Sequence, residues 1–350
     1  MIQANAVFRH AFYETFLHFH IALVILAIGA LWHHLKELPQ LPYLIVVIVA
    51  WALERSVRLA SLIFRNFGAS RTRAHVEALA GDALRVTVSP ARPWNFRPGQ
   101  HAYITIPAVG FWTSHPFSLA WSNVEQHPSL DDFEKGLPAT NPAEERHSPL
   151  GRASVSFIVR RRAGFTEKLF QKALQSPSSQ ITLGALVEGP YGGLHSLHSY
   201  GTVMLFAGGV GITHQVPYVR DLVAGFASGT VAARRVNLVW VIQSPEHLEW
   251  IRPWMTQILA MDKRRDVLRI QLFVTRPRST KEIHSPSATV QMYPGKPTVG
   301  TLLDMEMGQQ VGAMAVSVCG PAGLCDDVRR AVRGRQRQGN IDYSEECFSW

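Results

Sequence analysis

The chain has 350 residues, a formal net charge of +9, and a charged fraction of only 17% beside 47% hydrophobic residues. Typical soluble domains carry roughly 25% charged residues, and so apolar a composition excludes a mostly disordered chain. The cysteines, Cys319, Cys325 and Cys347, are too few for a disulfide scaffold, and the length predicts two or three domains.

Two uncharged runs near the start, 15–35 and 38–53, predict a transmembrane helical hairpin joined at Lys36 and Glu37. A spanning helix needs about 20 apolar residues. A signal peptide is not favoured, because no small-residue cleavage site follows the first run. Arginines cluster after the second run and mark the cytoplasmic side: Arg55, Arg58, Arg65, Arg71 and Arg73. We therefore expect an integral membrane protein whose later residues lie in the cytosol.

Histidines in the first run suggest a metal centre. At about 100° per residue, His20 and His34 share one helix face and lie about 21 Å apart along the axis, whereas His33 points elsewhere. Two imidazoles on one face could ligate two stacked haems. An ionisable residue inside a membrane is usually functional, which favours this interpretation. Alternatively, these histidines hydrogen-bond neighbouring helices or lie at the membrane interface.

Short β-rich runs between residues 75 and 188 predict a small antiparallel barrel. The runs are 83–89, 101–107, 154–160 and 181–187. Residues 125–150 are rich in Pro, Ser, Asp and Glu, which predicts an exposed insertion between strands.

Two motifs in the barrel carry chemistry. The first is His115-Pro116-Phe117-Ser118, preceded by Pro98-Gly99-Gln100, and the second is Gly164-Phe165-Thr166 before a helical segment. Gly164 permits close backbone approach, Thr166 is the expected N-cap, and a helix N-terminus favours a pyrophosphate. Arginines 160–162 add positive charge just upstream.

From residue 200 the sequence alternates apolar strands with helices, which predicts a parallel α/β sheet. The expected strands are 202–207, 236–242, 268–275 and 315–319, with a helix over 246–259. The first strand leads into Gly208-Gly209-Val210-Gly211-Ile212-Thr213, and the last ends in Cys319-Gly320-Pro321. Such a turn places a phosphate at a helix N-terminus. Cys319 could equally be a buried core thiol.

In this order and at this separation, the motifs resemble ferredoxin-reductase-type flavoproteins, and more closely the transmembrane ferric-chelate reductases and their NADPH-oxidase relatives. The resemblance implies that residues 115–118 hold FAD, with Phe117 flanking the isoalloxazine and Ser118 hydrogen-bonding near its reactive N5. It also implies that Cys319 lies beside the nicotinamide C4. The terminal Trp350 would lie against the flavin as a gate that moves aside for nicotinamide.

The sequence departs from this family in two respects. Relatives have further membrane helices upstream, one of which supplies the second pair of haem-ligating histidines, so we expect a shortened chain with an incomplete haem b site. Gln243 stands where many relatives carry a basic residue. The contact that distinguishes NADPH from NADH is therefore left open, with Arg276 as a candidate.

The sequence thus predicts a multi-domain chain: transmembrane helices over 1–66, an FAD-binding antiparallel β-barrel over 70–198, and an NAD(P)-binding α/β domain over 199–350. The predicted function is ferric-chelate reduction at the plasma membrane, from NADPH through FAD and haem b, in support of iron uptake. Membrane lipid and additional helices or a partner subunit are expected, and no nucleic acid. A superoxide-forming NADPH oxidase, a haem-free flavin diaphorase and an inactive regulatory subunit are the alternatives.

Overall fold

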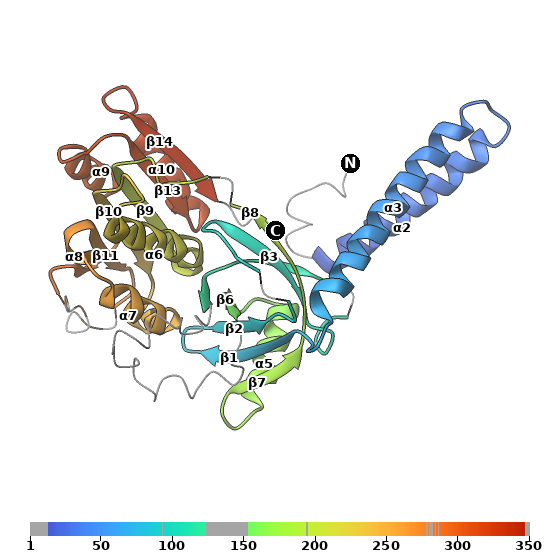
Figure 1. Cartoon of the computed structure of the whole chain (residues 1–350), viewed down its shortest axis with the longest axis horizontal. Helices are drawn as coiled ribbons and strands as arrows, with labels where there is room; N and C mark the ends of the chain where they lie inside the picture. Colours follow the sequence, from blue (N-terminus) through green and yellow to red (C-terminus); the bar gives the residue numbers. More distant parts are fainter. Residues whose placement is uncertain are drawn as a thin grey trace, which may run out of the picture. The chain divides into compact units, whose positions relative to one another are not determined.

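The computed structural model describes residues 13–346, apart from 93, 112, 124–152, 194, 278, 280–282, 284 and 286. The chain divides into two compact units, with the boundary in the sequence between Gly68 and Ala69 (Figure 1). We call them the hairpin unit and, after the function that the resemblance implies, the reductase unit. The predicted insertion over 125–150 and the terminal Trp350 lie outside the described residues.

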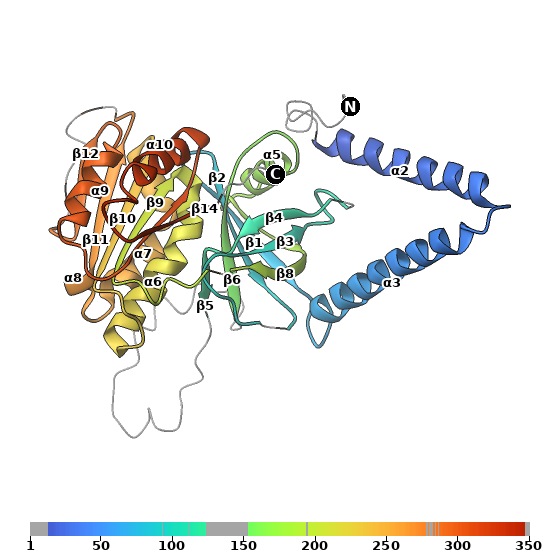
Figure 2. The same ribbon diagram turned by 90° about the horizontal axis from the view of Figure 1, so that it is seen from above.

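The hairpin unit consists of helix α2 (Tyr13–Leu35) and helix α3 (Leu41–Asn66), which meet at a short turn (Figure 2). Pro42 lies in the first turn of α3, where its missing N–H costs no hydrogen bond. The predicted hairpin is therefore present. By length and composition, however, among the described helices α2 alone could cross a membrane, over His18–Leu35. Helix α3 continues past its uncharged part into Glu54, Arg55 and Arg58, which explains this difference from the predicted second span.

Apolar side chains of the hairpin unit are largely uncovered. Leu26 is 68% exposed, Val46 is 65% exposed and Trp51 is 63% exposed. Soluble proteins rarely leave such contiguous apolar surface open.

The first half of the reductase unit is antiparallel, as predicted. One sheet has the order β5-β6-β2-β1-β7 and a second has the order β4-β3-β8. The elements are β1 (Arg73–Leu79), β2 (Ala83–Ser89), β3 (Gln100–Thr105), β4 (His115–Ser118), β5 (Trp121–Asn123), β6 (Ser154–Arg160), α5 (Phe165–Leu174), β7 (Gln180–Gly184) and β8 (Leu186–Gly192). The single strand predicted over 181–187 is wrong. The chain leaves the first sheet at Gly184 and enters the second at Leu186, so β7 and β8 are separate strands.

The second half of the reductase unit is a parallel sheet of order β12-β11-β10-β9-β13-β14 between two helical layers. Strand β9 alternates its side chains between a core under α6 and a core under α9 and α10. The elements are β9 (Thr202–Gly208), the 3-10 turn η3 (Gly209–Gly211), α6 (Ile212–Ser228), β10 (Arg235–Ile242), the 3-10 helix η4 (Pro245–Trp250), α7 (Arg252–Ala260), α8 (Arg264–Val267), β11 (Leu268–Val274), β12 (Val290–Pro294), α9 (Val299–Met307), β13 (Met314–Cys319), α10 (Ala322–Arg333) and β14 (Ile341–Glu346).

The single helix predicted over 246–259 is also wrong. The backbone breaks at Ile251 between η4 and α7, and Pro253 lies in the first turn of α7. A proline inside a continuous helix would clash with the carbonyl one turn earlier, so the proline starts a new helix instead.

One hydrophobic core runs through both halves of the reductase unit. The core under α6 includes Ala83, Trp121 and Ile158 from the antiparallel half. Trp121 stacks on Trp254 with ring centroids 5.8 Å apart and planes 5° apart. Such packing is typical of a domain interior, so the antiparallel and parallel halves form one body.

Candidate active site

The two flavin motifs lie together although about 50 residues separate them in the sequence. His115 opens β4, which pairs with β3, and its ring stacks on Phe165 at 4.4 Å between centroids. Phe165 is the first residue of α5. The end of α5 that could hold a phosphate therefore lies beside the tetrad 115–118, as the resemblance implies.

The start of α5 differs locally from the prediction. Gly164 is the N-cap residue, with φ +95° that favours glycine, and no side chain caps the helix. Thr166, expected as the cap, lies inside the first turn, and its hydroxyl bonds the Arg162 backbone at 2.9 Å. The N-cap prediction for Thr166 is thus wrong. An uncapped helix N-terminus leaves N–H groups for a ligand, which fits the pyrophosphate of FAD.

The arginines before α5 do not act alike. The Arg161 guanidinium pairs with Glu167 at 2.9 Å and Asp82 at 3.1 Å, and lies over the Phe170 ring. Arg160 and Arg162 are exposed. Of the predicted positive charges, those of Arg160 and Arg162 are therefore better placed to meet a phosphate.

The glycine turn and the cysteine turn interlock at one end of the parallel sheet. Ala207 is the register partner of Cys319. A Cβ added to Gly211 would lie 2.0 Å from the Cys319 carbonyl oxygen, and one added to Gly208 would lie 2.4 Å from the Pro321 ring. The glycines are therefore required by this close approach, which places Gly211, the residue before Ile212 and Thr213 of α6, beside Gly320.

Gly209 faces the other way. It has φ +53°, and an added Cβ would meet no atom within 4 Å. Its carbonyl accepts a hydrogen bond from the Trp240 indole of β10 at 2.9 Å, which holds the turn against the sheet. An open backbone turn at an uncapped helix N-terminus fits a dinucleotide phosphate.

Cys319 ends β13 and is fully buried. Its register partners are Ala207 on β9 and Glu346 on β14. The position agrees with either sequence reading, a thiol beside the nicotinamide or a core thiol, so its catalytic role stays a prediction. Ser118 is also buried, at 7% exposure.

The flavin barrel contacts the nucleotide helix through Gly99 of the turn before β3. An added Cβ at Gly99 would lie 2.3 Å from the Tyr218 hydroxyl of α6. That hydroxyl donates to the His195 carbonyl at 3.3 Å. Strand β6 of the barrel also contacts the glycine turn η3. The flavin and nucleotide motifs thus face one junction.

Burial controls the titratable groups of this junction. Desolvation lowers the pKa of His214, in the first turn of α6, to about 4, so the imidazole is neutral at physiological pH. Burial raises the pKa of Tyr218 to about 12, and the charges of Glu346 and Asp221 add to this effect. Burial also raises the pKa of Glu346, against the effect of His195. The junction therefore lacks a charged histidine at His214 and holds a protonated Tyr218.

Sequence reasoning missed the residues that join the two halves. Trp250 donates its indole N–H to the Ala80 carbonyl at 2.7 Å, and Arg85 donates to the carbonyls of Glu249 and Trp250 at 3.0 and 3.1 Å. Arg220 lies over Trp121 at 4.3 Å. The tryptophans of this part of the sequence were the available signal, since buried indoles need a partner for their N–H.

The metal candidates lie apart from this site in the chain. His20 and His34 are exposed on α2, and the His20 ring stacks on Phe16 at 5.9 Å. Helix α3 contains no histidine, and no metal-binding group of three or more side chains occurs among the described residues.

Comparisons with known proteins agree with this arrangement. Residues 69–131 match a family model described as FAD-binding domain, and residues 200–283 match one described as ferric reductase NAD binding domain. The Saccharomyces cerevisiae ferric reductase transmembrane component 3 is 25% identical over 376 residues, which cover 99% of this chain and 48% of that protein. The chain is therefore similar to the fungal ferric reductases.

Another relative, the Saccharomyces cerevisiae ferric/cupric reductase transmembrane component 2, is 25% identical over 377 residues, with 99% of this chain and 48% of that protein covered. The chain thus spans about half the length of these ferric reductase relatives. The solved CS-b5R domains of human Ncb5or are similar in fold, with a TM-score of 0.50 at 18% identity, covering 78% of this chain and 68% of that one. The ferredoxin-reductase-like fold and its FAD and NAD domains are therefore as predicted.

Proposed function

We propose that this chain reduces ferric chelates at a membrane, with NADPH as the electron donor, and so supports iron uptake. The observation that carries the donor half is the interlocked pair of turns, Gly208–Thr213 and Cys319–Pro321, at the junction with the flavin barrel. The acceptor half rests on the similarity to ferric reductases along nearly the whole chain, including the hairpin.

In this proposal the chain's own residues bind and orient the dinucleotide. The backbone of Gly209 and the first turn of α6 hold the pyrophosphate. Gly320 and Pro321 form the opposing wall, and Cys319 shapes the slot for the nicotinamide. The neutral His214 adds no charge that would compete for the phosphates.

FAD, when bound, supplies the conversion of a two-electron hydride donor into single-electron steps. The residues that hold it are the tetrad 115–118 and the uncapped N-terminus of α5 at Gly164. Phe117 provides an apolar wall for the ring system, and Ser118 provides a hydroxyl. The stacked pair His115 and Phe165 keeps the two parts of this site in register.

A preference for NADPH over NADH is assigned to Arg276. Its backbone N–H donates to the Gln243 carbonyl at 3.0 Å, so both residues lie together where β10 and β11 end. Arg276 is exposed and its planar guanidinium suits a phosphate. Replacement Arg276→Gln should raise the KM for NADPH and leave the KM for NADH unchanged, as steady-state assays with both donors would measure.

The membrane half of the proposal uses the hairpin unit. Helix α2 would lie in the plasma membrane, and the arginines of α3 and after it would keep the reductase unit in the cytosol. His20 and His34 would each supply one imidazole to hold a haem b. Because α3 offers no opposing imidazole, the described hairpin completes neither site, and the second ligands would come from further helices or a partner subunit.

The lack of a histidine on α3 also favours a second candidate function, that of a haem-free flavin diaphorase anchored by the hairpin. A superoxide-forming oxidase shares the donor half and differs in the acceptor. An inactive regulatory subunit would lack bound FAD.

Membranes containing the full chain would separate these functions. The proposal predicts NADPH-driven reduction of a ferric chelate that persists without oxygen and in the presence of superoxide dismutase. Where a partner subunit or further helices supply the second histidines, a pyridine haemochrome assay should detect haem b that is lost in His20→Ala and His34→Ala but retained in the control His33→Ala. Ferric reduction that needs oxygen would favour the oxidase, and NADPH oxidation without haem would favour the diaphorase.

A further inference from the structure

Strand β14 is the last described element and an edge strand of the parallel sheet. It pairs along its length with β13 alone, from Met314 opposite Ile341 to Cys319 opposite Glu346. Its first residue, Ile341, is buried in the core under α10, while the later residues are partly or fully exposed. Core packing therefore fixes the start of β14 but not its end.

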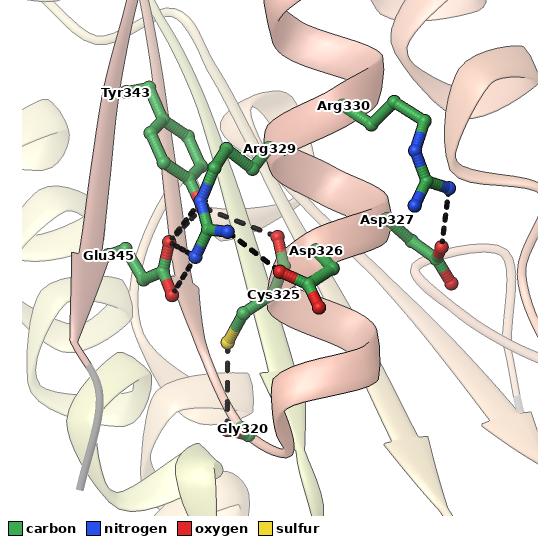
Figure 3. A network of polar contacts seen from close by, with 8 residues as sticks. All are labelled: Gly320, Cys325, Asp326, Asp327, Arg329, Arg330, Tyr343 and Glu345. Atoms are coloured by element: carbon green, nitrogen blue, oxygen red, sulfur yellow. Dashed lines mark hydrogen bonds and ion pairs between the residues drawn. The ribbon is translucent and has the colours of Figure 1, made fainter. Parts of the chain in front are cut away.

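A group of polar side chains fixes that end. Arg329 of α10 donates to Glu345 of β14 from Nε at 3.0 Å and from Nη2 at 2.6 Å to both carboxylate oxygens (Figure 3). The same guanidinium reaches Asp326 on its own helix at 2.7 Å. We call Asp326, Arg329, Tyr343 and Glu345 the β14 clamp. A planar guanidinium with several bonds to one carboxylate fixes direction as well as distance.

Tyr343 completes the clamp. Its hydroxyl lies 2.6 Å from Glu345 Oε2 and 3.4 Å from the Cys325 carbonyl oxygen, and its proton is donated over the shorter distance. Burial raises the pKa of Tyr343, and the hydrogen bond to Glu345 raises it further, so the hydroxyl remains a donor. The Cys325 thiol in turn donates to the Gly320 carbonyl, 3.6 Å away. The contacts thus lead from the last strand to the cysteine turn of the nucleotide site.

The neighbouring arginine offers an internal comparison. Arg330 pairs with Asp327 at 3.2 Å, but both side chains belong to the same helix and are 77% and 59% exposed. Glu345 has only 14% of its side chain exposed. Figure 3 shows Arg330 turned away from β14. An exposed pair within one helix contributes little, whereas the half-buried clamp joins two elements.

We propose that Arg329 and Glu345 are positioning residues for hydride transfer, which hold the end of β14 so that Glu346 stays opposite Cys319. This inference rests on the proposed function. The chain continues from Glu346 into the aromatic residues that end in Trp350, so the clamp also fixes where that tail begins. The glycine turn that would hold the dinucleotide phosphates lies on β9 and α6, and none of the clamp residues belongs to those elements.

The inference predicts a separation of rate from affinity. Releasing the end of β14 should leave FAD content and the KM for NADPH unchanged, because the flavin motifs and the glycine turn for the phosphates contain none of the clamp residues. The rate of flavin reduction should fall about tenfold. Hydride transfer slows steeply when the groups that position the nicotinamide, here Cys319 and Glu346, shift by about an ångström. A general loss of folding would instead lower FAD content.

The test compares Arg329→Met with the matched control Arg330→Met in the detergent-solubilised full chain. Flavin reduction by NADPH would be followed without oxygen in a stopped-flow instrument, with FAD content measured on the same samples. Arg329→Met should be about tenfold slower and Arg330→Met should match the wild type. Arg329→Lys should recover part of the rate, because an ammonium keeps the charge but not the planar contact.

Equal rates in the wild type and Arg329→Met, or equal slowing in both methionine variants, would overturn the inference while the proposed function stands. A wild-type flavin that neither NADPH nor NADH reduces would contradict the proposed function and the inference together. If Arg329→Met lost FAD, Tyr343→Phe would decide. That variant removes one hydroxyl and should slow reduction about twofold, and an unchanged rate would overturn the inference.

Discussion

The hairpin unit and the reductase unit differ in how far they bury their apolar side chains. In the reductase unit, Trp254 is 4% exposed and stacks on Trp121 of the other half, within one continuous core. In the hairpin unit, Trp51 is 63% exposed, and its neighbours on α3, Val49 and Leu53, are 58% and 64% exposed. The reductase unit therefore supplies its own apolar interior, whereas the described apolar side chains of the hairpin are left largely exposed.

The largest effect on the reductase unit is expected from a substitution in the interlocked turns. Gly211→Ala places a methyl group 2.0 Å from the Cys319 carbonyl oxygen, so β13 or α6 must move. We expect the KM for NADPH to rise by at least tenfold, as measured by steady-state flavin reduction. Gly323→Ala is the matched control, since its Cβ meets no atom within 4 Å. An equal effect of both substitutions would show that the close approach of the two turns is not what binding requires.

The same substitution at one tryptophan of each unit tests the comparison directly. Trp254→Ala should lower the free energy of unfolding of the reductase unit by about 3–5 kcal/mol, because it removes a buried ring. Trp51→Ala should change it by less than about 0.5 kcal/mol, because that ring packs on no protein core. Urea titration of the full chain in detergent, followed by the fluorescence of released FAD, would measure both. A comparable loss from Trp51→Ala would mean that the hairpin contributes to the stability of the reductase unit.

Acid should affect the reductase unit through His214. Its folded pKa of about 4 lies below the ordinary value of 6.5, so the unfolded state binds the extra proton first as pH falls. The contribution of neutral His214 to the free energy of unfolding is fully present above pH 6.5. About 3 kcal/mol of it is lost as the pH falls to about 4. His214→Gln should make the loss shallower in urea titrations across this range. Residual acid sensitivity is expected, because burial also lowers the pKa of His101 and His247. An unchanged pH dependence in His214→Gln would contradict this account.

Local patterns predicted much of the fold because local physics decides them. Strands β2 and β6 match the predicted runs 83–89 and 154–160, since short runs rich in β-branched and other apolar residues favour strands. The breaks at Gly184 and Ile251 were not predicted. Each depends on which sheet or helix layer the chain joins next, and no local pattern specifies that.

By itself the sequence determined the order of the parts, the apolar hairpin, and the motifs at His115, Gly164, Gly208 and Cys319, because each is a short stretch with its own chemistry. Only the tertiary structure decided that His115 stacks on Phe165, that Gly211 touches the Cys319 carbonyl, and that Arg329 holds Glu345. These contacts join residues far apart in the chain or on separate elements. Their energies come from shared burial and fixed distances, which exist only once the sheets have formed.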